Sequence, residues 1–210
     1  VWEWFPRPEN IRYRNAIAQM DEAIYNLIRT SRNRSEKTND LLSMLIEARD
    51  EDTGQQMDDK LLRDEVATLM LAGHETTANA LSWTWMLLAQ HPEVKEKLQA
   101  ELKQVLAGRL PTVADIKSLR YTDQIIKESM RLYPPVAMFG REAAQDAIVG
   151  DYSIPEGTTV MISQWAMHRN PKYFDQPDKF IPERWTEEFE TQFPRGVYIP
   201  FGDGPRICIG

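Results

Sequence analysis

The sequence predicts a mainly α-helical fold with a small antiparallel β region, and three features of the chain predict it. Apolar residues recur at helical spacing through most of residues 10–132. Short runs of β-prone residues, separated by glycine and proline, follow at residues 147–162. Residues 169–200 are rich in proline, aspartate and aromatic residues and have little periodicity, which predicts a long coil packed by its own side chains.

The helical part of the chain divides into segments with identifiable start and stop signals. Asp40 stands before a short apolar run as an N-cap residue, and Thr112 begins a capping sequence with Asp115. Pro92 opens one helix, and Gly108 ends it. The predicted helices cover residues 10–32, 41–46, 92–107 and 121–132, a short segment after Thr112, and a helix longer than 25 residues from Asp58 or Asp59 to Gln90. We expect the long helix to cross the whole domain, and residues 1–9 to be irregular.

The β region consists of three short runs joined by turn-forming residues. β-prone residues occupy positions 147–149, 152–154 and 159–162. Gly150 and Asp151 separate the first two runs, and a Pro-Glu-Gly sequence precedes the third. Such turns connect neighbouring antiparallel strands, so we expect one small antiparallel sheet.

Composition narrows the class of protein. The chain has 210 residues, of which 42% are hydrophobic and 27% charged, as in an ordinary soluble globular protein. Its net charge of −7 argues against a nucleic-acid partner, because nucleic acids favour a basic surface. A single cysteine excludes an internal disulfide and favours the reducing, intracellular side, either cytoplasmic or membrane-associated. No run approaches the ~18 apolar residues of a membrane span. The chain begins with Val and stops two residues after its cysteine, so we expect a piece of a longer protein.

The only cysteine, Cys208, lies in a loop in which two prolines and three glycines prevent regular helix or strand. A thiolate is a soft metal ligand, and tight turns around it leave room for a flat cofactor and for backbone N–H groups directed at sulfur. Arg206 adds a permanent cation with a forked donor that suits a carboxylate. The alternative is a buried structural cysteine in a glycine-rich turn. His91 and His168 stand at no ligand spacing from Cys208, and we interpret both as structural.

Inside the long predicted helix, residues 72–77 read Ala-Gly-His-Glu-Thr-Thr. Thr76 shares a helix face with Gly73 and Ala72, and these two small residues leave a groove where a flat group approaches the backbone. A threonine hydroxyl there is able to bond the carbonyl four residues earlier and bend the helix. Glu75 supplies a carboxylate for proton transfer. The alternative is a glycine–threonine kink in a core helix.

Glu128 and Arg131 are three positions apart on a predicted helix, where their side chains can pair. Most such pairs are exposed and contribute only about 0–1 kcal/mol. The downstream sequence Pro-Glu-Arg-Trp at residues 182–185 supplies a further cation, Arg184.

Four motifs resemble those of the cytochrome P450 family and occur in the family's order. They are Ala-Gly-x-Glu-Thr-Thr at 72–77, Glu-x-x-Arg at 128–131, Pro-Glu-Arg-Trp at 182–185 and Phe-x-x-Gly-x-Arg-x-Cys-x-Gly at 201–210. The resemblance implies the C-terminal half of the P450 fold. Residues 1–210 would then be one partial domain that lacks the N-terminal half and the helix after the cysteine loop.

The resemblance also implies roles for individual residues. It implies haem b (iron protoporphyrin IX) as the cofactor and Cys208 as its metal ligand, the thiolate ligation known for this family. Thr76 would hydrogen-bond iron-bound dioxygen, and Glu75 would relay protons. The other implied cofactor-binding residues are Arg206, Phe201, Gly204, Gly210, Ala72, Gly73 and Arg141, the last as a second propionate contact whose alternative is an ordinary surface arginine. A buried network of Glu128, Arg131 and Arg184 would hold the coil that leads to Cys208.

The function implied by the resemblance is monooxygenation of a small apolar substrate with O2 and with electrons from a reductase or ferredoxin. A haem-thiolate peroxygenase or isomerase and a non-enzymatic haem sensor are the alternatives, although the Glu75–Thr76 pair favours the use of dioxygen. As pocket lining we predict a set of apolar residues that flank the motifs: Leu71, Ala72, Val136, Ala137, Met138 and Phe139. They suit a lipid-like or terpenoid substrate. The sequence does not indicate whether the whole protein is attached to a membrane.

Overall fold

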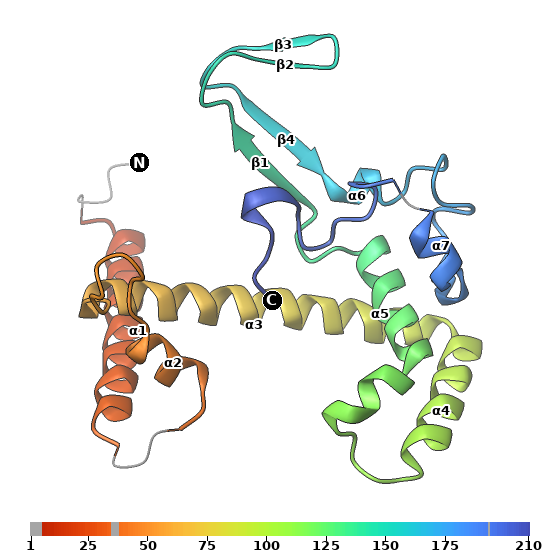
Figure 1. Cartoon of the computed structure of the whole chain (residues 1–210), viewed down its shortest axis with the longest axis horizontal. Helices are drawn as coiled ribbons and strands as arrows, with labels where there is room; N and C mark the ends of the chain where they lie inside the picture. Colours follow the sequence, from red (N-terminus) through yellow and green to blue (C-terminus); the bar gives the residue numbers. More distant parts are fainter. Residues whose placement is uncertain (1–5, 35–37, 193) are drawn as a thin grey trace. The chain divides into compact units, whose positions relative to one another are not determined.

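The computed structural model describes residues 6–34, 38–192 and 194–210. These residues form two compact units, which divide between Glu75 and Thr76 inside helix α3 (Asp59–Gln90). Helices dominate both units, and all of the β-strands belong to the second (Figure 1). The predicted fold class, mainly α with a small antiparallel β region, is confirmed.

The first unit contains α1 (Pro8–Arg32), α2 (Leu41–Glu47) and the beginning of α3. As predicted, Asp40 caps α2, because its Oδ1 accepts a hydrogen bond of 2.8 Å from the Ser43 N–H. The N-terminal helix starts at Pro8, two residues earlier than predicted; of the stretch predicted to be irregular, residues 1–5 lie outside the described residues. The core of this unit is built from buried aliphatic side chains: Ile24, Ile28, Leu62 and Ala67.

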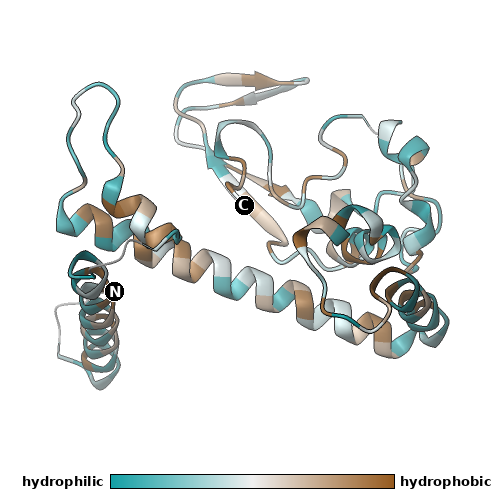
Figure 2. Cartoon of the chain, turned by 60° about the horizontal axis from the view of Figure 1, so that its bottom comes forward, coloured by the Kyte–Doolittle hydropathy of each residue, from teal (hydrophilic) through white to brown (hydrophobic). Residues whose placement is uncertain are grey.

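The second unit contains the rest of α3 together with α4 (Pro92–Leu106) and α5 (Arg120–Leu132). Its main core joins the apolar faces of these helices to one side chain of the later coil, Phe180; the helical members are Leu87, Leu88, Val94, Ile125 and Leu132. Hydrophobic and hydrophilic residues alternate along α3 in Figure 2, as expected of a helix with a buried side. The segment after Thr112 is a 3₁₀ helix (Val113–Ser118), and its capping sequence places the Thr112 N–H 2.8 Å from Asp115 Oδ2.

The strands form two separate antiparallel pairs, so the prediction of one small sheet is wrong in this detail. Strands β2 (Ala147–Val149) and β3 (Tyr152–Ile154) make the predicted hairpin. Strand β4 (Thr159–Ser163) pairs instead with β1 (Met138–Glu142), which the sequence analysis did not identify. A glycine and two charged residues, Gly140–Glu142, interrupt the apolar pattern of β1, and its strand character depends on pairing with β4.

The coil predicted at residues 169–200 is packed by its own side chains, as expected, but it is not wholly irregular, because η2 and α7 lie within it. Three buried side chains, Phe174, Trp185 and Val197, form its core. The segment beyond β4 contains four short helical elements: α6 (Gln164–Met167), η2 (Pro182–Arg184), α7 (Glu187–Thr191) and η3 (Gly204–Arg206). In the described part of the chain, no helix combines the length and hydropathy that crossing a membrane requires.

Candidate haem-binding site

Two backbone hydrogen bonds close the cysteine loop (residues 201–210). The N–H of Gly202 donates to the Ile199 carbonyl over 2.9 Å, and the N–H of Cys208 donates to the Phe201 carbonyl over 2.9 Å. Gly202 and Gly204 both have φ of 75°, in the left-handed region where a side chain would be strained. The sequence motif therefore has a physical reason, since its glycines permit the turns that present Cys208.

The loop presents a soft donor and a cation to solvent. The Cys208 side chain is exposed. Asp203 pairs with Arg195 at 3.0 Å, and this contact and the Gly204 N–H lower the pKa of the Asp203 carboxyl. Since Asp203 is engaged by Arg195, Arg206 keeps its charge available, and it forms no ion pair within the described residues. An exposed thiol beside a free guanidinium fits a flat cofactor that carries an iron and carboxylates.

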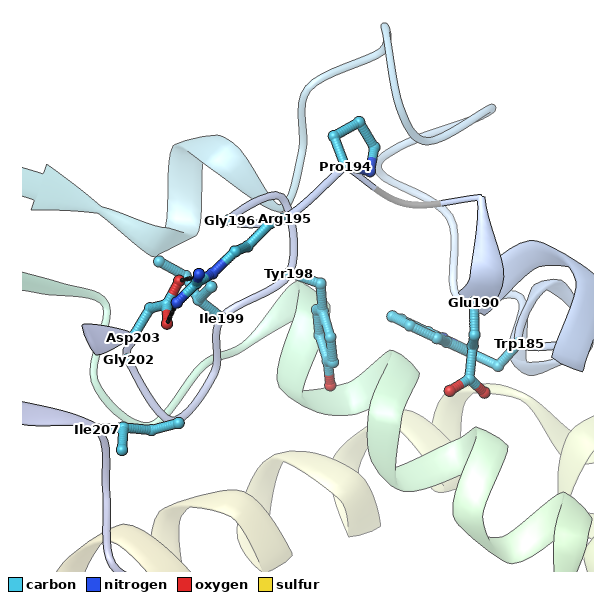
Figure 3. Close-up of a pocket in the computed structure, with 10 residues that line it drawn as sticks. All are labelled: Trp185, Glu190, Pro194, Arg195, Gly196, Tyr198, Ile199, Gly202, Asp203 and Ile207. Carbon is cyan, nitrogen blue, oxygen red and sulfur yellow. Dashed lines mark hydrogen bonds and ion pairs between the residues drawn. The ribbon is translucent and has the colours of Figure 1, made fainter. Parts of the chain in front are cut away.

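A cavity of about 360 Å³ lies beside the cysteine loop (Figure 3). Trp185 and Tyr198 supply aromatic surface, and the Arg195–Asp203 pair is joined by dashed lines at one edge. The remaining lining residues come from the coil and the loop: Glu190, Pro194, Gly196, Ile199, Gly202 and Ile207. This cavity contains none of the residues predicted to line a substrate pocket, so that prediction concerns a different surface.

The segment predicted to face the cofactor lies within α3, which is helical without interruption through residues 72–77. Ala72, Gly73 and Glu75 are exposed and belong to the first unit, whereas Thr76 is partly exposed and belongs to the second. A Cβ built on Gly73 would meet no heavy atom within 4 Å, as a helix face open to a flat group requires. The roles assigned to these residues stay predictions.

Arg141 lies in β1, opposite Val160 of β4. Its guanidinium carbon lies 4.8 Å from the centre of the Phe139 ring, and its Nη1 donates to the Gly140 carbonyl at 2.9 Å. The side chain is exposed and able to reach a ligand, so the propionate contact stays a prediction.

Glu128 of α5 is the buried centre of a polar network that joins this helix to the coil. Its carboxylate is 0% exposed and receives five hydrogen bonds. Two come from Arg131, at 2.8 and 2.9 Å, and one comes from Arg184 Nε at 3.0 Å. The Ile181 N–H and the Trp185 indole N–H supply the others, at 3.0 and 2.8 Å. The structure thus brings together the three residues that the sequence placed in a network.

Arg131 extends this network along the coil by donating to backbone carbonyls. It reaches His168 O at 2.8 Å, Pro177 O at 2.6 Å and Lys179 O at 3.0 Å, and its guanidinium lies 5.0 Å from the Phe174 ring centre. One buried arginine therefore satisfies three carbonyls of a segment with little secondary structure. Sequence reasoning missed these contacts, because backbone acceptors leave no signal in residue type.

His168, which follows α6, is a buried residue whose imidazole is held in one protonation state. The ring is 0% exposed, and Nε2 accepts a hydrogen bond of 3.0 Å from the Ile199 N–H. Nε2 must therefore be unprotonated, and a neutral ring carries its proton on Nδ1. Burial, and then the charge of Arg131, lower the pKa of His168 from 6.5 to about 4. Besides Arg131, the groups that act on this ring are Arg169, the backbone of Met130 and the tilted ring of Tyr198.

This environment predicts a pH dependence of stability. Between pH 6.5 and 4 the unfolded chain binds a proton at His168 that the folded chain excludes, so the free energy of unfolding falls as pH falls. The loss attributable to His168 reaches about 3 kcal/mol across this window. Urea unfolding of the whole protein from pH 4 to 7.5 measures it, with His168→Gln as the non-titrating reference. Parallel curves for the two proteins would contradict the prediction.

Comparison with known proteins gives one consistent family. The sequence profile of the family described as Cytochrome P450 matches residues 1–210. Cyclooctat-9-en-7-ol 5-monooxygenase of Streptomyces melanosporofaciens is 40% identical over 210 residues, 100% of this chain and 46% of the relative. Pentalenene oxygenase of Streptomyces avermitilis is 38% identical over 205 residues, covering 98% of this chain and 45% of the relative. The chain thus spans about half the length of the curated relatives it matches.

Solved structures agree with the sequence relatives. The haem domain of cytochrome P450DA has a TM-score of 0.88 with 34% identity, over 96% of this chain and 45% of that structure. The retinoic acid-bound cyanobacterial CYP120A1 has a TM-score of 0.89 with 31% identity, over 97% of this chain and 47% of that structure.

Proposed function

Since the chain belongs to the cytochrome P450 family, we propose that the whole protein is a haem-thiolate monooxygenase that inserts one atom of O2 into a small apolar substrate. Haem b is the cofactor that the family and the solved haem domains imply. One observation supports the proposal above the others. The only thiol of the chain is exposed on a loop closed by hydrogen bonds, two residues after Arg206, which forms no ion pair within the described residues.

Each site residue has a defined task in this proposal. When bound, haem supplies an iron centre able to activate O2 and transfer one of its atoms. Cys208 holds the iron through its thiolate, and Arg206 neutralises the cofactor's carboxylates. Thr76 orients oxygen through its hydroxyl, and Glu75 moves protons toward it. Phe201, Gly204 and Gly210 would contact the cofactor from the same loop.

The proposed substrate is apolar, and lipid-like or terpenoid in character. Its support is the run of apolar residues after α5, in which Val136 and Met138 are 41% and 54% exposed. Two relatives are named for the oxygenation of cyclooctat-9-en-7-ol and pentalenene. Electrons would come from NAD(P)H through a reductase or a ferredoxin.

The absorption spectrum of the reduced, carbon-monoxide-treated whole protein tests the proposal. A thiolate-type Soret shift is expected, and its absence would reject the haem-thiolate assignment. Product formation with NAD(P)H and a reductase then identifies a monooxygenase. Turnover that requires only peroxide would identify a peroxygenase, and a shift without turnover of any substrate would favour a haem sensor.

The Thr76→Ala variant tests whether the Thr76 hydroxyl positions oxygen to receive the protons that Glu75 delivers. We expect oxygen and NAD(P)H consumption to continue while product formation falls about a hundredfold and hydrogen peroxide appears, since a positioned proton-transfer group typically contributes at least that factor. Thr68→Ala is the matched control, because Thr68 lies on the same helix and its hydroxyl donates to the Asp64 carbonyl at 2.8 Å. Equal product yields from both variants would contradict the role of Thr76.

A further inference from the structure

Ile199, which lies two residues before the cysteine loop, is fixed by a side chain 31 positions earlier in the chain. Its N–H donates to His168 Nε2 at 3.0 Å, and its carbonyl accepts from the Gly202 N–H at 2.9 Å. The same residue is therefore held by His168 on one side and closes the first turn of the loop on the other. Any displacement of Ile199 moves the peptide on which the loop begins.

The backbone of His168 is itself fixed by two hydrogen bonds. Its carbonyl accepts from Arg131 Nη1 at 2.8 Å, and its N–H donates to the Gln164 carbonyl at 2.8 Å. The ring packs on Tyr198 with the ring centres 5.0 Å apart, and the Tyr198 hydroxyl donates to the Lys127 carbonyl of α5 at 3.0 Å. Two consecutive residues, 198 and 199, are thus attached to the same framework of α5 and His168.

We propose that His168 is a positioning residue for the thiolate site: its neutral Nε2 anchors Ile199 and so ties the start of the cysteine loop to the buried Glu128–Arg131 pair. The chain of contacts runs from Glu128 through Arg131 to the backbone of His168, and from its ring to Ile199 and the turn at Gly202. This inference rests on the proposed function, because it assigns the cysteine loop to haem ligation.

The anchor requires a neutral hydrogen-bond acceptor at position 168. Nε2 acts as an acceptor, so the ring must be neutral, and the buried site keeps it so. Nδ1 makes no hydrogen bond of standard geometry within the described residues, although the backbone groups of Met130 and Arg131 partly offset the lowering of the His168 pKa. An apolar ring in place of His168 would fill the space and leave the Ile199 N–H without its acceptor.

Hydrogen–deuterium exchange of the whole protein, read on a peptide covering residues 196–210, tests the anchor without depending on activity. In His168→Phe we expect exchange in this peptide to become about tenfold faster, because a partly buried donor loses its acceptor. We also expect a larger share of the haem to lose the thiolate-type Soret shift. His168→Gln, which offers a neutral acceptor oxygen, should recover most of both properties.

His91→Phe is the matched control. His91 also makes one ring-to-backbone hydrogen bond, from Nδ1 to Leu87 O at 2.8 Å, and packs on an aromatic ring, Phe180, at 5.1 Å. Its replacement should leave exchange in residues 196–210 unchanged. If His168→Phe behaves like His91→Phe, or if glutamine gives no recovery, the proposal is overturned.

Two further outcomes keep the proposal separate from the proposed function. If the wild-type protein lacks the thiolate-type shift, the proposed function fails, while the exchange data still decide whether His168 anchors Ile199. If His168→Phe does not fold, ¹⁵N NMR of the wild-type imidazole decides instead. A neutral ring protonated on Nδ1 at pH 7 is expected, and protonation on Nε2 would overturn the proposal.

Discussion

Replacing Cys208 by serine is expected to abolish the thiolate-type Soret shift of the reduced, carbon-monoxide-treated whole protein and, with it, substrate oxygenation. Serine keeps the size and polarity of the side chain, but its hydroxyl is a hard donor that stays protonated near neutral pH. The loop should keep its shape, because its closing hydrogen bonds at Gly202 and Cys208 use backbone atoms. The measurement is the difference spectrum, normalised to the haem that remains bound.

Ile209→Val provides the control from the same loop. Ile209 is 87% exposed, so removing one methylene there should alter neither the turns nor the ligand. This variant should retain the full shift. A serine variant that shows the same shift as Ile209→Val would mean that sulfur is not the ligand, because Cys208 is the only cysteine of the 210 residues.

The sequence predicts those features of the site that depend on which side chain stands at a position, and not those made by backbone atoms. The turns of the cysteine loop were predictable from its glycines, because the left-handed φ found at Gly202 and Gly204 favours glycine over other residues. The pairing of Glu128 with Arg131 was also predictable from spacing, and its extension to Arg184 from the family's motifs. The contributions of the Ile181 N–H and the coil carbonyls were not, since every residue carries those groups.

The missed secondary structure has a related cause. The residues of β1 have only a weak preference for strand conformation, and the strand forms because it pairs with β4. The residues that determine it therefore lie about twenty positions away in the sequence. Helix α7 is five residues long and is capped by Thr186, whose hydroxyl accepts from the Phe189 N–H at 3.1 Å. One capped turn gives too little periodicity to detect. The prediction that His168 has a structural role agrees with its burial. Its hydrogen bond to Ile199 could not be predicted, because the two residues are brought together only by the folded course of the coil.

Replacing Glu128 by alanine is expected to lower the free energy of unfolding of the whole protein by about 3–5 kcal/mol, the cost of leaving buried charges without their counter-ion. Arg131 is 0% exposed and the Arg184 side chain is 7% exposed, so neither guanidinium has solvent as a substitute partner. The Trp185 indole N–H loses its acceptor as well. Chemical denaturation followed by tryptophan fluorescence measures the loss, and the loss should also reduce haem retention, since Arg131 holds the coil that carries the cysteine loop.

Glu183→Ala is the control that separates the effect of burying a carboxylate from the effect of its charge. Glu183 also pairs with a cation, Lys97, and accepts from the Tyr121 hydroxyl at 2.9 Å, but its side chain is 44% exposed. Exposed pairs contribute about 0–1 kcal/mol, so this variant should change stability by no more than that. If both variants lose the same small amount, the network of Glu128 does not hold the coil. A large loss confined to Glu128→Ala would show that a buried carboxylate fixes the segment on which the thiolate depends.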